Sequence, residues 1–175
     1  MIAFLKEFDI ATMVAIFVLI FYMIISLAIF LYKIVNLNSF FSCEAKALNS
    51  LVKNKELSFD AYLKPCEDSK SKLQVYKNTA TRKLSEGLTW LGIIATTSPF
   101  IGLFGTVVSI YITLTNLTST NDISKIANPI GHALIATAAG IICAVLAYTF
   151  HLLVKRKIFD CMNVIDSQVK ILEDE

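Results

Sequence analysis

Three long stretches of this chain contain no aspartate, glutamate, lysine or arginine. They cover residues 10–32, 88–121 and 126–154. A helix needs about 20 consecutive apolar residues to cross the hydrocarbon core of a bilayer, and each stretch is long enough. The pattern therefore predicts an all-α integral membrane protein with three transmembrane helices embedded in a lipid bilayer.

The composition of the whole chain agrees with this interpretation. Only 17% of the 175 residues are charged, whereas a soluble domain carries about 25%. The first stretch could be mistaken for the apolar part of a signal peptide. It is longer than a typical one, however, and Lys33 and Ile34 follow it where a cleavage motif of small residues would stand. We therefore expect it to remain as a membrane anchor.

The distribution of lysine and arginine predicts the orientation, because cytoplasmic loops carry an excess of them. Segment 33–87 has ten, the loop 118–127 has one, and the tail before the first span has one. Three basic residues, 155–157, directly follow the third span. We expect the N-terminus outside and the C-terminus inside the cytoplasm. The net charge of +2 then reflects topology rather than nucleic-acid binding.

The polar segments are predicted to form long helical extensions of the spans on the cytosolic side. Residues 38–54 contain neither glycine nor proline, and Pro65 should end this helical pattern. A second helix from Glu67 should run on into the second span, because Gly87 alone is a weak helix breaker.

The last segment repeats apolar residues at steps of three and four, which predicts a helix continuous with the third span. This face consists of Ile158, Met162, Ile165, Val169 and Leu172. The chain should thus divide into an N-terminal tail with the first transmembrane helix (1–34), a cytosolic helical segment (35–87), a transmembrane hairpin (88–157) and a C-terminal cytosolic helix (158–175).

The second and third spans each carry a face of small or hydroxyl-bearing side chains, and such faces let helices approach closely. On the second span the face consists of Gly102, Thr106, Ser109, Thr113 and Asn116. On the third it consists of Ala133, Thr137, Gly140, Ala144 and Ala147. The first span is apolar all round, with only Thr12 and Ser26 as small polar residues, and this favours contact with lipid.

Two of these threonines are predicted to lie at a similar depth. At 1.5 Å of rise per residue, Thr106 lies roughly 17 Å below Leu117, and Thr137 roughly 12 Å below Pro129 on the antiparallel helix. The hydroxyls could serve ordinary helix packing, or they could line a polar passage shared by several subunits. Apart from two histidines, no acidic or basic residue lies in any span. A proton or ion path would therefore need an ionisable group from a partner.

Enzymatic chemistry has little support in the sequence. The spans hold no pair of carboxylates, and the chain has neither a glycine-rich phosphate loop nor a convincing Ser-His-Asp arrangement. The four cysteines include no CxxC pair, so neither a metal site nor a redox motif is predicted. We expect no cofactor.

Two motifs give a more specific indication. The segment TTSPFIGLFGTVVSIYITL (96–114) precedes IANPIGHALIATAAGIICAVLAYTFHLLVKRK (126–157). Their sequences, their order and the three-span layout resemble the MotA/TolQ/ExbB proton-channel family, most closely its ExbB and TolQ branch. The resemblance covers residues 67–157 well, and the first span and residues 38–66 in layout only.

The resemblance implies a function and a set of partners. Proteins of this family form a pentameric ring in the bacterial inner membrane around the single transmembrane helices of an ExbD- or TolR-like partner, which carry an aspartate. Protons driven by the proton-motive force pass this aspartate, and the resulting motion is transmitted to a TonB- or TolA-like protein that acts on the outer membrane. The resemblance therefore predicts a proton-channel subunit with a periplasmic N-terminus and a cytoplasmic C-terminus.

The resemblance also implies roles for individual residues. Thr106 and Thr137 match the threonine layer that faces the partner helices in this family. The expected proton-pathway and partner-facing residues are Thr106, Thr137, Ser109, Thr113 and His132. The expected helix-packing residues are Gly102, Gly105, Ala133, Gly140 and Ala144.

His132 departs from the family pattern, because ExbB and TolQ members usually have a glutamate at this position. An imidazole is neutral or cationic and cannot replace the negative charge of a carboxylate. His132 could act as a polar anchor at the outer opening, take part in proton entry, or pack in a subunit contact.

Two rival functions remain open at this stage. One is a non-conducting structural scaffold that holds a single-span partner through the small faces. The other is a flagellar- or gliding-type stator, but such a chain usually has an extra span and a larger cytosolic segment than 175 residues accommodate. The sequence does not distinguish ExbB from TolQ, or protons from sodium ions.

Overall fold

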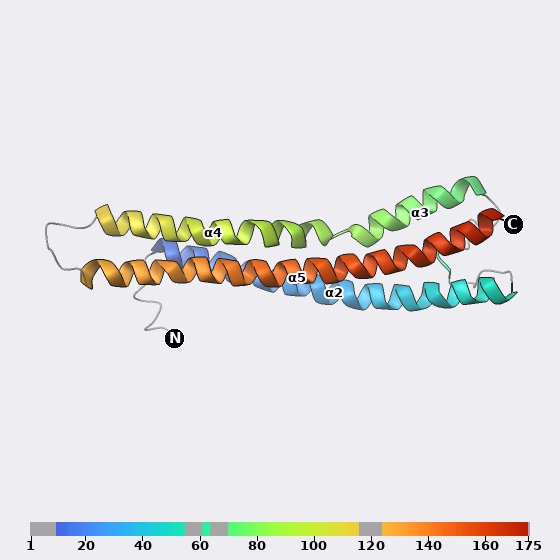
Figure 1. Cartoon of the computed structure of the whole chain (residues 1–175), viewed down its shortest axis with the longest axis horizontal. Helices are drawn as coiled ribbons and strands as arrows, with labels where there is room; N and C mark the ends of the chain where they lie inside the picture. Colours follow the sequence, from blue (N-terminus) through green and yellow to red (C-terminus); the bar gives the residue numbers. More distant parts are fainter. Residues whose placement is uncertain (1–9, 55–60, 64–69, 116–123, 175) are drawn as a thin grey trace. The chain divides into compact units, whose positions relative to one another are not determined.

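The computed structural model describes residues 10–54, 61–63, 70–115 and 124–174 (Figure 1). Within these ranges the chain forms four helices and no strand. The helices are α2 (Ile10–Asn54), α3 (Lys70–Ser85), α4 (Leu88–Thr115) and α5 (Ser124–Asp174). Three helical stretches are long and apolar enough to cross a membrane. The predicted all-α fold with three candidate membrane-spanning helices is confirmed.

Two helices continue from an apolar stretch into a polar one without a break. Helix α2 has 45 residues and α5 has 51, so each is longer than the roughly 20 residues that a bilayer requires. Helix α2 contains neither glycine nor proline, and an established helix extends easily because each further residue adds a hydrogen bond. The predicted continuity of the third span with the C-terminal helix is confirmed. Pro65 and Asn116 lie outside the described residues.

The helix expected to run unbroken from Glu67 into the second span is interrupted. Helix α3 ends at Ser85 and α4 begins at Leu88, and Gly87 between them has a φ of 80°. Glycine adopts this conformation at little cost and often ends a helix with it. A Cβ at Gly87 would lie 3.5 Å from Lys33 Cε, which is an ordinary contact. The prediction was wrong because it treated Gly87 only as a weak helix former and ignored its access to positive φ.

The chain divides into two compact units. Unit 1 comprises Met1–Ala28 and Trp90–Phe150, and unit 2 comprises Ile29–Thr89 and His151–Glu175. Unit 1 therefore contains most of the three charge-free stretches. Unit 2 contains most of the charged residues.

The described core of unit 1 is small and draws on three helices. It consists of Leu19 from α2, Ile94 and Ala95 from α4, and Cys143 and Ala147 from α5. Large apolar side chains lie on the outside of this unit instead; Phe17, Phe104 and Val145 are 60%, 68% and 59% exposed. Extensive exposed apolar surface of this kind marks contact with a membrane or with other proteins.

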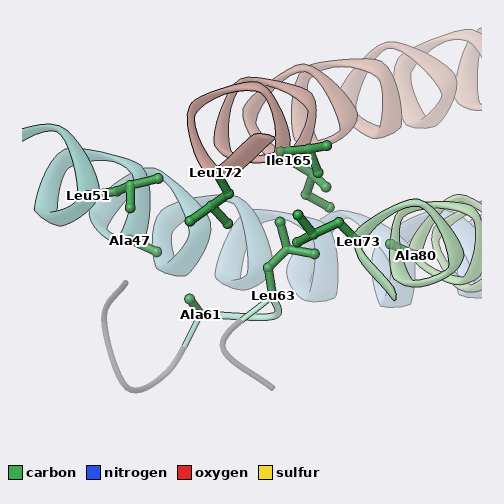
Figure 2. Close-up of a cluster of buried hydrophobic side chains, with 9 residues drawn as sticks. Ala47, Leu51, Ala61, Leu63, Leu73, Ala80, Ile165 and Leu172 are labelled. Atoms are coloured by element: carbon green, nitrogen blue, oxygen red, sulfur yellow. The ribbon is translucent and has the colours of Figure 1, made fainter. Parts of the chain in front are cut away.

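Unit 2 has a larger aliphatic core (Figure 2). Figure 2 shows side chains from α2, α3, α5 and the segment 61–63 gathered in one cluster. Its buried members are Ala47, Leu51, Ala61, Leu63, Leu73, Ala80, Ile165, Val169 and Leu172. Of the apolar face predicted on the last segment, four residues are at most 7% exposed and Met162 packs partly buried against the cluster. The predicted face is confirmed, and it packs on helices of its own chain.

A buried carboxylate ties the segment 61–63 to this core. Glu44 is 1% exposed. Its Oε1 accepts a hydrogen bond from Tyr62 N at 2.9 Å, and its Oε2 accepts one from Gln168 Nε2 at 3.0 Å. A second bond of 3.0 Å runs from Gln168 Nε2 to Glu44 O. Buried polar groups are tolerated when they are hydrogen-bonded in this way, and this contact connects three separate segments of unit 2.

Candidate functional site

Helices α4 and α5 approach each other in unit 1 through two glycines. A methyl group on Gly102 would lie 2.6 Å from Ala136 O and 3.0 Å from Thr137 Cα. One on Gly140 would lie 2.7 Å from Ser98 O and 3.2 Å from Gly102 Cα. These neighbours are backbone atoms, which cannot turn aside as a side chain can. Only glycine fits at either position while the two backbones remain in contact.

Helix α2 joins this contact from a third side. A methyl group on Gly105 would lie 2.8 Å from Ala15 Cβ. Thr12, Ala15, Leu19 and Ser26 of α2 are all buried, at 5% exposure or less. The first span, predicted to contact lipid, is therefore not exposed on every side. One strip of it packs on protein, because Ala15 allows a close approach opposite a glycine.

The hydroxyls of Thr106 and Thr137 lie beside the glycine contact and touch each other. Thr106 Oγ1 is 3.1 Å from Gly102 O and 3.1 Å from Ala133 O. Thr137 Oγ1 is 3.3 Å from Gly102 O. Each hydroxyl has a single proton to donate, so two protons serve these carbonyls and the contact between the two oxygens. Thr106 and Thr137, for which the helix rise predicted a similar depth, are in direct contact.

The residues predicted to face the partner differ in the exposure of their side chains. Thr106 and Ser109 are buried, at 7% and 2% exposure. Thr137 and Thr113 are half-buried, and Thr113 Oγ1 donates to Ser109 O at 2.8 Å. His132 is half-buried and precedes Ala133 on α5. Thr137 is therefore the more accessible member of the threonine pair. The predicted packing residues Ala133 and Ala144 are also buried, at 0% and 9% exposure.

Three further residues, which the sequence pattern did not indicate individually, take part in this contact. Ala136 supplies the carbonyl closest to Gly102 and is fully buried. Ser98 supplies the carbonyl closest to Gly140, and its Oγ lies 3.5 Å from Cys143 Sγ. The sequence could have indicated the first two by their small size and spacing. Ala136 lies one turn from Ala133 and from Gly140, and Ser98 lies one turn from Gly102. Ala15 gave a similar signal on the first span.

The chemistry of this site is limited by its residue types. Hydroxyls donate and accept hydrogen bonds but remain uncharged at ordinary pH. The three charge-free stretches supply no carboxylate or ammonium group. The site can orient a polar group that approaches Thr137, but a titrating charge must come from elsewhere.

Residues 43–167 match the MotA/TolQ/ExbB proton channel family. The chain belongs to this family. The matched region begins at Cys43, in the polar part of α2. It includes both glycine contacts and the threonine pair.

Individual relatives differ in how much of this chain they match. An ExbB-like biopolymer transport protein of Helicobacter pylori (strain ATCC 700392 / 26695) is 37% identical over 163 residues, covering 88% of this chain and 86% of the relative. Matches of this extent include part of the first span. The biopolymer transport protein ExbB of Neisseria gonorrhoeae is 51% identical over 74 residues, covering 39% of this chain and 34% of its own length. The ExbB protein of Xanthomonas campestris pv. campestris (strain B100) is 44% identical over 73 residues, covering 39% and 29%.

Proposed function

We propose that this chain is the channel-forming subunit of an ExbB-type biopolymer transport complex in the bacterial inner membrane. Several copies, five by analogy with the family, surround the transmembrane helices of an ExbD- or TolR-like partner that carries an aspartate. Protons driven by the proton-motive force pass this aspartate, and the complex energises a TonB- or TolA-like protein. Family membership and the names of the ExbB relatives support this proposal.

The observation that carries the proposal is the threonine pair where α4 and α5 pack against each other. Thr106 and Thr137 bring two hydroxyls together within spans that have no charged side chain of their own. A partner carboxylate near Thr137 would find a hydrogen-bond donor there, and hydrogen bonds favour the charged form of a carboxylate. This arrangement fits a channel whose titrating group is supplied by a partner.

The two threonines have different roles in this proposal. Thr137 is half-buried, so its hydroxyl presents the polar group to the partner helix. Thr106 is 7% exposed and contacts two carbonyls of its own chain. Thr106 therefore holds α4 and α5 in register and orients Thr137 rather than meeting the partner itself.

A pair of isosteric substitutions tests the proposal. Thr137→Val and Thr106→Val each remove one hydroxyl at nearly constant volume. The controls are Thr149→Val on α5 and Thr96→Val on α4, whose exposed hydroxyls bond only to carbonyls of their own helices. Each variant is co-reconstituted with the proposed single-span partner, and proton flux is measured in liposomes. We expect both site variants to lose most of the flux and both controls to retain it. Undiminished flux in Thr137→Val would contradict the channel proposal.

A non-conducting scaffold is the second candidate, and one observation favours it. Both hydroxyls of the threonine pair have carbonyl acceptors on α4 or α5, so they can serve ordinary helix packing without a partner. The same preparation separates the two functions, because a scaffold would hold the partner in co-purification yet conduct no protons even without substitution.

A further inference from the structure

A cavity in unit 2 lies where the polar ends of the first two hydrophobic stretches come together. Its volume is about 170 Å³, and its walls include Lys33, Asn36, Phe40, Lys83 and Leu84. Lys33 is the first residue after the stretch 10–32, and Lys83 lies shortly before Leu88, where the second stretch begins. The cavity therefore carries two ammonium groups at the edge of the membrane-spanning region.

Lys33 is unusually buried for a lysine, at 9% exposure. Its Nζ donates one hydrogen bond, to Leu84 O at 3.2 Å, although an ammonium group has three protons to donate. Burial lowers the pKa of Lys33, and the charge of Glu86 opposes this only in part. Among the described residues no carboxylate lies within ion-pair distance of Lys33. Burying an ammonium without a paired anion costs free energy. An anion bound in the cavity would offset this cost.

The surroundings of the cavity suit an anion that carries apolar chains. A shallow, open apolar groove runs along α2 and is lined by Leu31, Tyr32, Val35, Asn36 and Ser39. Asn36 belongs to the walls of both the cavity and the groove. Leu31 and Tyr32 lie at the end of the first hydrophobic stretch and are 55% and 69% exposed. A molecule with its anionic head between the lysines could lay a hydrocarbon chain along this groove.

We propose that this cavity binds the anionic headgroup of a membrane phospholipid, with an acyl chain in the adjoining groove. The volume of the cavity is well above the roughly 10–15 Å³ that one water needs, so a small anionic group such as a phosphate has room there. Lysines at the cytoplasmic edge of a membrane attract anionic lipids, and Lys83 lies at the surface where a headgroup would enter. The bound lipid would join α2 to α3 through the charges of Lys33 and Lys83.

The test counts lipids that stay bound to the full-length protein. The protein is released from nanodiscs of phosphatidylcholine with a minor share of phosphatidylglycerol, and retained lipids are measured by native mass spectrometry. We expect preferential retention of phosphatidylglycerol, with affinity about fivefold weaker in Lys83→Gln and in Lys33→Gln. Lys46→Gln on α2 and Lys72→Gln on α3 are the matched controls, since both lysines are exposed and lie outside the cavity walls. Both controls should retain the lipid.

Three outcomes would overturn the proposal. One is equal retention of phosphatidylcholine and phosphatidylglycerol. Another is equal loss of phosphatidylglycerol in the cavity variants and the controls. A third is displacement of the lipid by inorganic phosphate at low concentration, which would identify a site for a free anion or an acidic partner side chain. Lys83 is exposed, so Lys83→Gln gives a decisive result even if Lys33→Gln fails to fold.

Discussion

The two units of this protein pack their helices by different means. Unit 1 brings α4 and α5 together through Gly102 and Gly140, with hydroxyls beside them, whereas unit 2 fills its interior with leucine, isoleucine and alanine. In water, burying large apolar side chains is the main stabilising contribution. In a bilayer that contribution largely disappears between helices, and close backbone contact and hydrogen bonds replace it. The difference indicates that unit 1 is built to pack in lipid and unit 2 in water.

The largest effect on stability should come from truncating a large side chain in the aliphatic core of unit 2. Leu51 is 1% exposed, so Leu51→Ala should lower the free energy of unfolding by about 2–5 kcal/mol. The neighbouring Val52 is 66% exposed, and Val52→Ala should change it by less than about 0.5 kcal/mol. Thermal unfolding in mild detergent measures both. Equal effects would mean that this core contributes little to stability.

A smaller but substantial effect is expected from adding one methyl group to the glycine contact of unit 1. Gly140→Ala places its Cβ 2.7 Å from Ser98 O and should destabilise the protein by about 1–3 kcal/mol through overpacking. Gly131 has nothing within 4 Å of the same position, so Gly131→Ala should stabilise α5 slightly through its better helix propensity. A tolerated Gly140→Ala would remove the proposed difference between the units.

The threonine pair should matter less for stability than for function. Thr106→Val removes a hydroxyl from between Gly102 O and Ala133 O and should cost about 0.6–1 kcal/mol. Thr149→Val, at an exposed position, should be close to neutral. Unfolding of the two variants is compared with their proton flux. A stability loss in Thr106→Val far above this range would assign that residue a purely structural role.

The smallest effect should come from a half-buried ion pair of unit 2 between Lys77 and Asp166. Lys77 Nζ lies 2.9 Å from Asp166 Oδ1, and the two side chains are 31% and 38% exposed. Asp166→Asn should therefore cost less than about 0.5 kcal/mol, and high salt should reduce the difference further. Asp160→Asn on the same helix controls for the change in net charge. A larger loss that salt does not reduce would point to packing rather than charge.

Much of the fold and part of the candidate site could be predicted from local pattern. Charge-free stretches of sufficient length predict spans, and steps of three and four predict the buried face at Ile165 and Val169. The rise per residue placed Thr106 and Thr137 within about one helical turn of the same depth because helix geometry is nearly constant. Three features escaped prediction. Gly87 ends a helix through its backbone conformation, and Ala15 faces a glycine on another helix. Glu44 bonds to a residue more than one hundred positions away.

The sequence alone determined the number of apolar helices, the continuity of the third span with the C-terminal helix and the family to which the chain belongs. These properties depend on length, periodicity and short motifs within single segments, which each segment carries by itself. Tertiary structure alone decided which face of the first span packs on protein, which threonine remains accessible, and where Lys33 is buried. These outcomes depend on which atoms of distant segments meet, and no single segment specifies its own neighbours.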